Sequence, residues 1–203
     1  MTAMLQKIAP TFSATDCTSA IEDGDCVRRC LQGDTAAFDE VVVRYQKPVF
    51  NAIFHMVNNY EDTRDLSQSA FLKAFINLES FDERRPLFSW LYRIAINEAL
   101  NFLSGKRRVE PIVVDPPSTA AGPDEDFEAK EIARQLEDAM AQLSPDYRAA
   151  VVLRHSLGLS YDEAAEILAI PVKTFKSRLY SARQMLREHL MANGFGRQTS
   201  SNA

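Results

Sequence analysis

The stretch SYDEAAEILAIPVKTFKSRLYSARQMLREH, residues 160–189, decides the fold of the C-terminal part of this chain. Ser160 can cap a helix, and Glu163 can accept a hydrogen bond from the backbone amide of Ser160, which together form the pattern of a capping box. Pro171 lacks an amide donor and is tolerated only near a helix start, so one helix ends and another begins around residues 169–172. The stretch therefore predicts a helix-turn-helix.

The second of these helices has two faces of different chemistry. Apolar residues recur at steps of four, three and four, as on the buried stripe of an amphipathic helix: Phe175, Leu179, Ala182 and Leu186. Hydrogen-bond donors follow another face: Lys173, Lys176, Tyr180, Arg183 and Arg187. Such a row suits a helix in the major groove of DNA with flanking phosphate contacts. The alternative is an ordinary solvated basic face, but the capped helix and short turn in front favour DNA reading.

Residues 81–108 form a second segment of interest, in which aromatic and basic residues mix. Its aromatic residues are Phe81, Phe88, Trp90 and Tyr92, and its basic residues are Arg84, Arg85, Arg93, Lys106, Arg107 and Arg108. Aromatic rings stack on unpaired bases for about 1–3 kcal/mol each, while cations follow the phosphates. The alternative is a hydrophobic core, because Leu87, Leu91, Ile94 and Ala95 already form an apolar stripe. On spacing alone, core is the favoured interpretation for each single aromatic residue.

The rest of the chain predicts an all-α fold of two small helical domains joined by a flexible linker, the C-terminal domain being the helix-turn-helix. Asp34, Pro48, Asp62 and the pair Ser144-Pro145 mark helix starts. Residues 109–124 hold four prolines among small and polar residues, which is typical of a linker. The predicted division is a tail (1–25), a first domain (26–108), the linker (109–130), a second domain (131–190) and a tail (191–203).

Three stretches resemble a known family, the extracytoplasmic-function (ECF) sigma factors of the sigma-70 family of bacterial RNA polymerase. The run Phe81 to Asn101, with WLYRIAINEALN at 90–101, resembles the promoter-melting region, and DLSQSAFLKAF (65–75) is similar to the polymerase-binding helix. LSPDYRAAVVLRHSLGLSYDEAAEILAIPVKTFKSRLYSAR (143–183) resembles the second DNA-binding domain. The stretches follow the family's order. Ser69 departs from the pattern, since it stands where the family usually has an acidic residue.

The resemblance implies a promoter-specificity subunit and assigns its contacts. Binding of core RNA polymerase would involve Asp65, Leu66, Gln68 and Phe71. Recognition and melting of the minus-ten promoter element would involve Phe81, Trp90, Arg93, Asn97 and Asn101. Recognition of the minus-thirty-five element would involve Lys173, Lys176, Ser177, Arg178, Tyr180, Ser181 and Arg183. The family further implies transcription initiation from a stress regulon, with an anti-sigma factor that silences the protein.

Charge distribution agrees with a directed contact to DNA. The net charge of −5 by itself argues against non-specific nucleic-acid binding, but the basic residues cluster at 84–108 and the acidic ones at 115–138. Residues 1–25 contain no signal-peptide pattern, so we expect a cytoplasmic protein.

We expect no enzyme activity, cofactor or small-molecule substrate, because the sequence has no phosphate-binding glycine loop, nucleophile elbow or metalloprotease motif. Cys17, Cys26 and Cys30 leave open a redox or metal sensor, although packing of small residues in the first helix is favoured. No histidine lies at ligand spacing to these thiols, so no metal is expected.

Two other functions remain as alternatives. A dimeric helix-turn-helix regulator would explain residues 160–189 but leaves the aromatic and basic segment without a role. An RNA-binding adaptor would use the same aromatic residues but has no use for a groove-reading helix.

Overall fold

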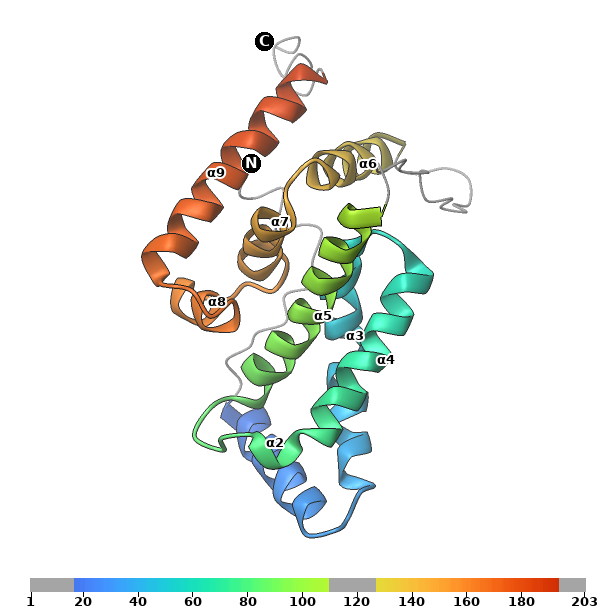
Figure 1. Cartoon of the computed structure of the whole chain (residues 1–203), viewed down its shortest axis with the longest axis vertical. Coiled ribbons are helices and arrows are strands. Elements are labelled where there is room, and N and C mark those ends of the chain that lie inside the picture. The colour runs from blue at the N-terminus through green and yellow to red at the C-terminus, as the bar shows by residue number, and fades with distance from the viewer. Residues whose placement is uncertain (1–16, 110–126, 194–203) are drawn as a thin grey trace.

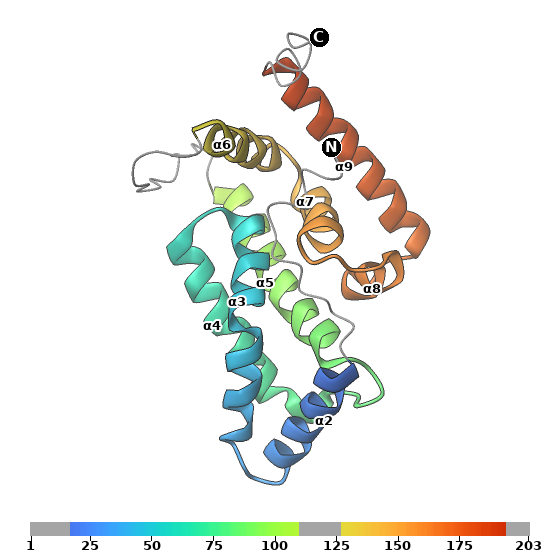
Figure 2. The ribbon, with the colours of Figure 1, turned by 180° about the vertical axis from the view of Figure 1, so that it is seen from behind.

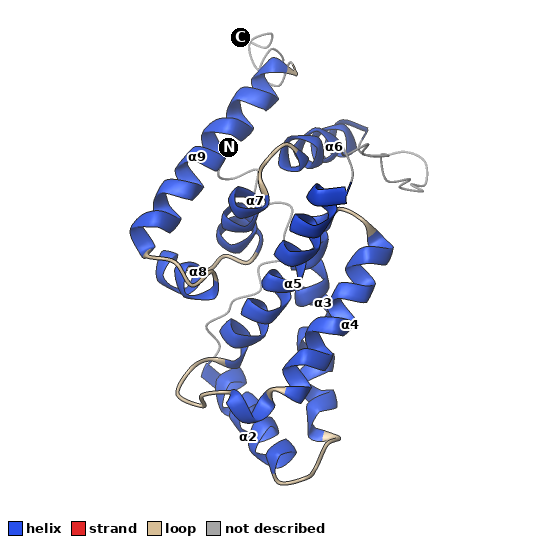
Figure 3. Ribbon diagram, viewed as in Figure 1, coloured by secondary structure: helices blue, strands red, loops and turns tan. Residues whose placement is uncertain are grey.

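The computed structural model describes residues 17–109 and 127–193, and within these ranges the chain is all-helical with no strand. The N-terminal half contains α2 (Cys17–Leu31), α3 (Ala37–Val57), α4 (Tyr60–Ile76), the short helix η2 (Leu78–Ser80) and α5 (Leu87–Val109). The C-terminal half contains α6 (Phe127–Ala141), α7 (Pro145–Val151), the π-helical turn η3 (Val152–Ser156), α8 (Tyr161–Ile167) and α9 (Val172–Ala192). Figure 3 shows the same helical architecture. The predicted fold class is confirmed.

The N-terminal half is a bundle in which α3, α4 and α5 pack against one another and α2 crosses them near one end (Figures 1 and 2). Large buried side chains fill its centre, among them Tyr45, Ile53, Leu91, Tyr92 and Ile96. Tyr45 and Arg44 also hold α2 in place, because both donate to the buried carboxylate of Asp23. Packing of these apolar stripes fixes which face of each helix remains outside.

Helix starts in this half differ from the prediction at three places. Pro48 lies inside α3 and does not begin a helix. A proline removes one helical hydrogen bond, but Tyr45 and Val49 on either side of Pro48 are buried in the same core, which keeps the segment helical. The cap of α4 is Asn59, whose side chain accepts from the amide of Asp62 at 3.0 Å, so Asp62 is the bonded residue and not the cap. Asp34 lies before α3, which has Ala36 at its N-cap position.

The C-terminal half matches the predicted helix-turn-helix closely. Ser160 and Glu163 form both hydrogen bonds of a capping box at the start of α8. Ala169 adopts a left-handed backbone conformation with φ of 52° between α8 and α9, and α9 then begins after Pro171. Phe175, Leu179, Ala182 and Leu186 are all buried, as their spacing predicts. Pro145 lies at the start of α7 as expected, and Gly158, with φ of 68°, follows the π-helical turn.

The predicted linker, residues 109–130, falls largely outside the described residues, but α6 already begins at Phe127. The two halves pack directly against each other, which the sequence did not predict. α5 packs against α7 and α8, and α3 packs against α7 and η3. Both ribbon views show α7 and α8 beside α5, with α9 on their outer side (Figures 1 and 2).

Candidate nucleic-acid and polymerase interfaces

One face of α5 presents hydrogen-bonding side chains to solvent. Arg93, Asn97 and Asn101 are all exposed and follow one another at steps of four, so they lie on one side of the helix. At the start of this face the half-buried rings of Phe81 and Trp90 pack against each other with centroids 5.3 Å apart. The structure therefore brings together all five residues predicted for the minus-ten element.

Two other aromatic residues of this segment belong to the core. Phe88 and Tyr92 are 7% and 1% exposed, so neither can stack on a base without unfolding α5. Burial raises the pKa of the Tyr92 hydroxyl above its usual value. The core interpretation holds for this pair, while Phe81 and Trp90 remain partly exposed.

The loop at residues 81–86 carries two arginines with different partners. Arg84 donates to Asp82 from its backbone amide and from Nε, at 3.1 and 2.9 Å, and these bonds hold the pKa of the Asp82 carboxyl below its usual value. Arg85 instead pairs with Glu166 of α8, in the other half of the chain. The loop is thus tied both to itself and to the helix-turn-helix.

The outer face of α9 is exposed at Lys173, Lys176, Ser177 and Tyr180, and the Tyr180 side chain is 73% exposed. Lys176 lies over the ring of Tyr161 with its Nζ 5.4 Å from the ring centre, on the side of α9 that faces α8. Ser181 is half-buried beside this face.

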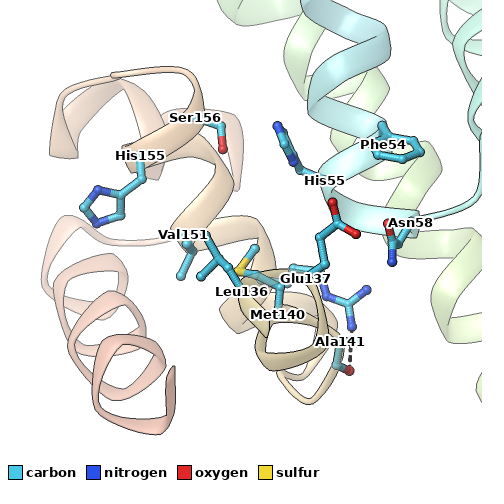
Figure 4. Close-up of a pocket in the computed structure, with 11 residues that line it drawn as sticks. Phe54, His55, Asn58, Leu136, Glu137, Met140, Ala141, Val151, His155 and Ser156 are labelled. Carbon is cyan, nitrogen blue, oxygen red and sulfur yellow. Dashed lines mark hydrogen bonds between the residues drawn. The ribbon is translucent and has the colours of Figure 1, made fainter. Parts of the chain in front are cut away.

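Two arginines predicted for the same DNA contact have protein partners instead. Arg178 pairs with Asp146 of α7 at 3.0 Å, and Arg183 donates from Nε and Nη2 toward His155 Nε2 at 3.1 and 3.0 Å. Burial and the two neighbouring arginines lower the pKa of His155 to about 4, so at neutral pH the ring is uncharged and can accept. Figure 4 shows the His155 ring turned away from His55. Both arginines are partly covered at the rim of the face.

The candidate polymerase-binding residues lie along α4. Asp65 and Gln68 are exposed, whereas Leu66 and Phe71 are half-buried and pack against the core. Ser69 donates to Glu98 of α5 at 2.9 Å, so its hydroxyl faces the neighbouring helix.

Sequence reasoning missed two residues of this helix. Leu72 and Ile76 are 60% and 67% exposed, and they continue the line of Asp65 and Gln68 at helical steps of four. Exposed large apolar side chains grouped on one surface mark an interaction site. The available signal was their position off the buried stripe of Ala70 and Ala74.

The two described thiols are buried. Cys26 donates to Glu40 at 3.3 Å, and burial followed by this hydrogen bond raises the pKa of Cys26 to about 11. Burial also raises the pKa of Cys30. The side chain of Cys17 lies outside the described residues. Among the described residues no cluster of three potential metal ligands occurs.

None of the helices in residues 17–109 and 127–193 is both long and apolar enough to cross a bilayer.

Comparisons with known proteins cover both halves. The chain matches the family "Sigma-70 region 2" over residues 41–109 and the family "Sigma-70, region 4" over residues 133–186. It is 34% identical over 182 residues to the ECF RNA polymerase sigma-E factor of Haemophilus influenzae. This alignment covers 84% of this chain and 96% of that protein.

Two solved structures share the fold. CnrH, in complex with the cytosolic domain of CnrY, superposes with a TM-score of 0.66 at 24% identity, covering 85% of this chain and 99% of that one. The sigma factor RpoE of Bartonella quintana, in complex with the anti-sigma factor NepR, superposes with a TM-score of 0.60 at 24% identity, covering 76% and 96%.

Proposed function

Because the chain belongs to the ECF sigma factors of the sigma-70 family, which are transcription initiation factors and not enzymes, we propose that it directs RNA polymerase to a specific set of promoters. In this proposal α4 binds core polymerase, the loop at 81–86 with α5 opens the minus-ten element, and α8 with α9 binds the minus-thirty-five element. The corresponding domains are residues 26–108 and 131–190, with 109–130 as the linker.

The observation that carries the proposal is the exposed face of α5 beside the Phe81–Trp90 pair. The Asn97 and Asn101 amides each offer a donor and an acceptor, which suits the edge of an unpaired base. Arg93 can hold the adjacent phosphate, and the partly exposed ring of Phe81 can stack on the base. Opening DNA then requires no covalent chemistry, because binding energy that favours the extruded base over the paired one is sufficient.

On α9 the exposed side chains would read the duplex. Lys176, Ser177, Tyr180 and Ser181 face the groove in this proposal, and Lys173 lies nearer the phosphates. Arg178 and Arg183 would exchange Asp146 and His155 for phosphate oxygens. Such an exchange is inexpensive at Arg178, because a surface ion pair contributes only about 0–1 kcal/mol.

On α4 we assign the polar contacts with polymerase to Asp65 and Gln68. Leu72 and Ile76 would supply the apolar part of the same contact, while Leu66 and Phe71 support it from beneath. An apolar patch with charged and amide neighbours is the usual composition of a protein–protein interface.

We further propose that an anti-sigma factor silences the protein and that its promoters belong to a stress regulon. Family membership supports this proposal, and the RpoE structure of B. quintana contains an anti-sigma factor. The site of action would be the cytoplasm, where RNA polymerase works.

Run-off transcription tests the function. The chain should give transcripts from a promoter with cognate minus-thirty-five and minus-ten elements when added to core polymerase, and neither component should do so alone. Scrambling the minus-ten element is the control. Tight binding of the chain alone to a palindromic duplex, with no recruitment of polymerase, would replace this proposal with the dimeric regulator.

A further inference from the structure

A pocket of about 70 Å³ lies beside the guanidinium of Arg148 in α7. Phe54 and His55 line it from α3, and Leu136 and Met140 line it from α6 (Figure 4). A cavity of about 150 Å³ can hold a benzene molecule, so this pocket has room for about three to five non-hydrogen atoms. Apolar walls with a few polar groups are the usual composition of a small-molecule site.

Arg148 brings a buried positive charge to this pocket. The residue is only 8% exposed, and Nη1 and Nη2 donate to the backbone carbonyl oxygens of Met56 and Ala141. Its buried Nε has no hydrogen-bond partner among the described residues. Burial lowers the pKa of Arg148, and no carboxylate in the described part of the chain opposes that effect. A ligand oxygen at Nε would therefore satisfy a donor that is costly to leave without a partner.

Glu137 brings a negative charge to the same pocket. Figure 4 shows its carboxyl group directed from α6 toward the side of α3 that carries His55 and Asn58. Burial, and then the charge of Asp138, raises the pKa of Glu137, and no cation among the described residues offsets these effects. Burial also lowers the pKa of His55, so its ring is mostly uncharged at neutral pH. Glu137 and Arg148 thus line one pocket without compensating each other.

These two uncompensated charges determine which class of ligand fits. A carboxylate alone would satisfy Arg148 but would meet the like charge of Glu137, whereas an amine alone would leave Arg148 as it is. A neutral amide could bond to both groups but would compensate neither charge. A molecule that carries a carboxylate and an ammonium group compensates both, through charge-assisted hydrogen bonds.

We propose that this pocket binds a small zwitterionic amino acid, with its carboxylate at Arg148 Nε and its ammonium group at Glu137. The volume limits the ligand to about the size of glycine or alanine, and the methyl group of alanine would contact Leu136 and Met140. A ligand of so few atoms is expected to have a dissociation constant of about 0.1–10 mM. The inference goes beyond the function proposed above, because this binding needs neither polymerase nor DNA.

Titration of the full chain with alanine, followed by two-dimensional NMR of the backbone amides, tests the site. Alanine should cause saturable shifts at residues 136–141 and 151–156, which include much of the pocket lining. Propionate lacks the ammonium group of alanine, ethylamine lacks its carboxylate, and propionamide lacks both charges. At equal ionic strength each of these three compounds should bind more weakly than alanine by about ten-fold or more.

Glu137→Gln tests the contact with the ammonium group. The variant keeps a side chain of the same size, and urea denaturation checks that it folds like the wild type. It should bind alanine about ten-fold more weakly and propionate more tightly than the wild type, because the carboxylate no longer meets a like charge.

Asp138→Asn is the matched control, since it removes the same charge from the adjacent residue. Asp138 is exposed, lies 3.9 Å from Arg134 and does not line the pocket. This variant should bind alanine within about two-fold of the wild type.

Three results would overturn the proposal. The first is the absence of saturable shifts at the pocket with alanine at concentrations up to about 100 mM. The second is equal binding of all four compounds, which would show that the pocket admits any molecule of that size. The third is an equal loss in Glu137→Gln and Asp138→Asn, which would reduce the effect to general electrostatics. None of these results bears on transcription, which the run-off assay tests separately.

Discussion

Lys176 and Asn97 are both exposed, but they lie on surfaces proposed to bind paired and unpaired DNA respectively, so their loss should have different effects. Lys176→Ala removes a cation at the proposed groove-facing side of α9. We expect weaker binding to closed promoter duplex, with a salt slope smaller by about 0.9 if one phosphate contact is lost. Holoenzyme binding to duplex at several salt concentrations measures this, and an unchanged slope would mean that Lys176 touches no phosphate.

Asn97→Ala removes hydrogen bonds that the proposal makes only to an extruded base. Closed-complex affinity should therefore hold while open-complex formation falls, at about 1–3 kcal/mol for a good base contact. Potassium permanganate footprinting of unpaired thymines measures the opening. A premelted bubble is the control: it should rescue opening but leave base preference at that position relaxed. Normal melting together with unchanged preference on the bubble would move the base pocket elsewhere.

Cys26 gives a prediction with a definite pH dependence. Its pKa is raised to about 11, so at pH 8 the native thiol is almost entirely protonated and its thiolate fraction is far below that of an ordinary cysteine. Reaction of Cys26 with a thiol reagent should be slow at pH 8, accelerate as pH rises toward 11, and become fast on unfolding.

The double change Cys26→Ser with Cys30→Ser should accordingly leave transcription and its response to oxidant unchanged. Fast labelling of native Cys26 at pH 8, or loss of an oxidant response in the double variant, would favour the redox sensor.

At the scale of the element, α4 has a buried face with Ala70 and Ala74 and an exposed apolar face with Leu72 and Ile76. Leu72→Asp and Ile76→Asp should each weaken binding to core polymerase by ten-fold or more, because each places a charge within a proposed apolar contact. Stability should hardly change, since both side chains are more than half exposed. Competition with a labelled sigma factor for core polymerase measures the affinity.

Val43→Asp on α3 is the matched control for these changes, because Val43 is 70% exposed and lies on another helix. Equal loss of affinity in all three variants would point to a general effect of charge, and no loss in any would place the polymerase contact away from this face.

The helices also show how much of the structure can be predicted from residues that lie close together in the sequence. The capping box at Ser160 and the buried stripe of α9 depend on residues three or four apart, and both occur as predicted. Pro48 shows the limit of such rules. Proline alone suggests a helix start, but burial of Tyr45 and Val49 outweighs one missing hydrogen bond, and α3 continues through it.

At the scale of the whole molecule, Arg148 joins several segments. Its guanidinium donates to the carbonyl oxygens of Met56, Ala141 and Leu143, and burial lowers its pKa. Arg148→Met keeps much of the volume but removes every donor and leaves buried carbonyls without partners. We expect the free energy of unfolding to fall by about 2–4 kcal/mol, measured by urea denaturation.

Arg64→Met is the control for that measurement. Arg64 pairs with Glu61 on the surface of α4 and is about half exposed, so its loss should change stability by less than about 1 kcal/mol. Comparable losses in the two variants would mean that the Arg148 bonds contribute little in solution.

The sequence by itself determined the helical fold and the helix-turn-helix. These features follow from caps, breakers and periodicity, which act between residues a few positions apart. The resemblance of three stretches to a known family also sufficed to indicate the function class, because the residues of these stretches and their order along the chain are specific to that family.

Only the tertiary structure decided which of the predicted side chains are free to act. Arg178 and Arg183 carry the right charge at the right spacing, yet Asp146 of α7 and His155 of η3 bind them. Leu72 and Ile76 are apolar but are left outside by the packing of α4, and Arg85 meets Glu166 across the chain. Periodicity says which face of a helix is apolar, but which partner covers that face depends on contacts between residues far apart in sequence.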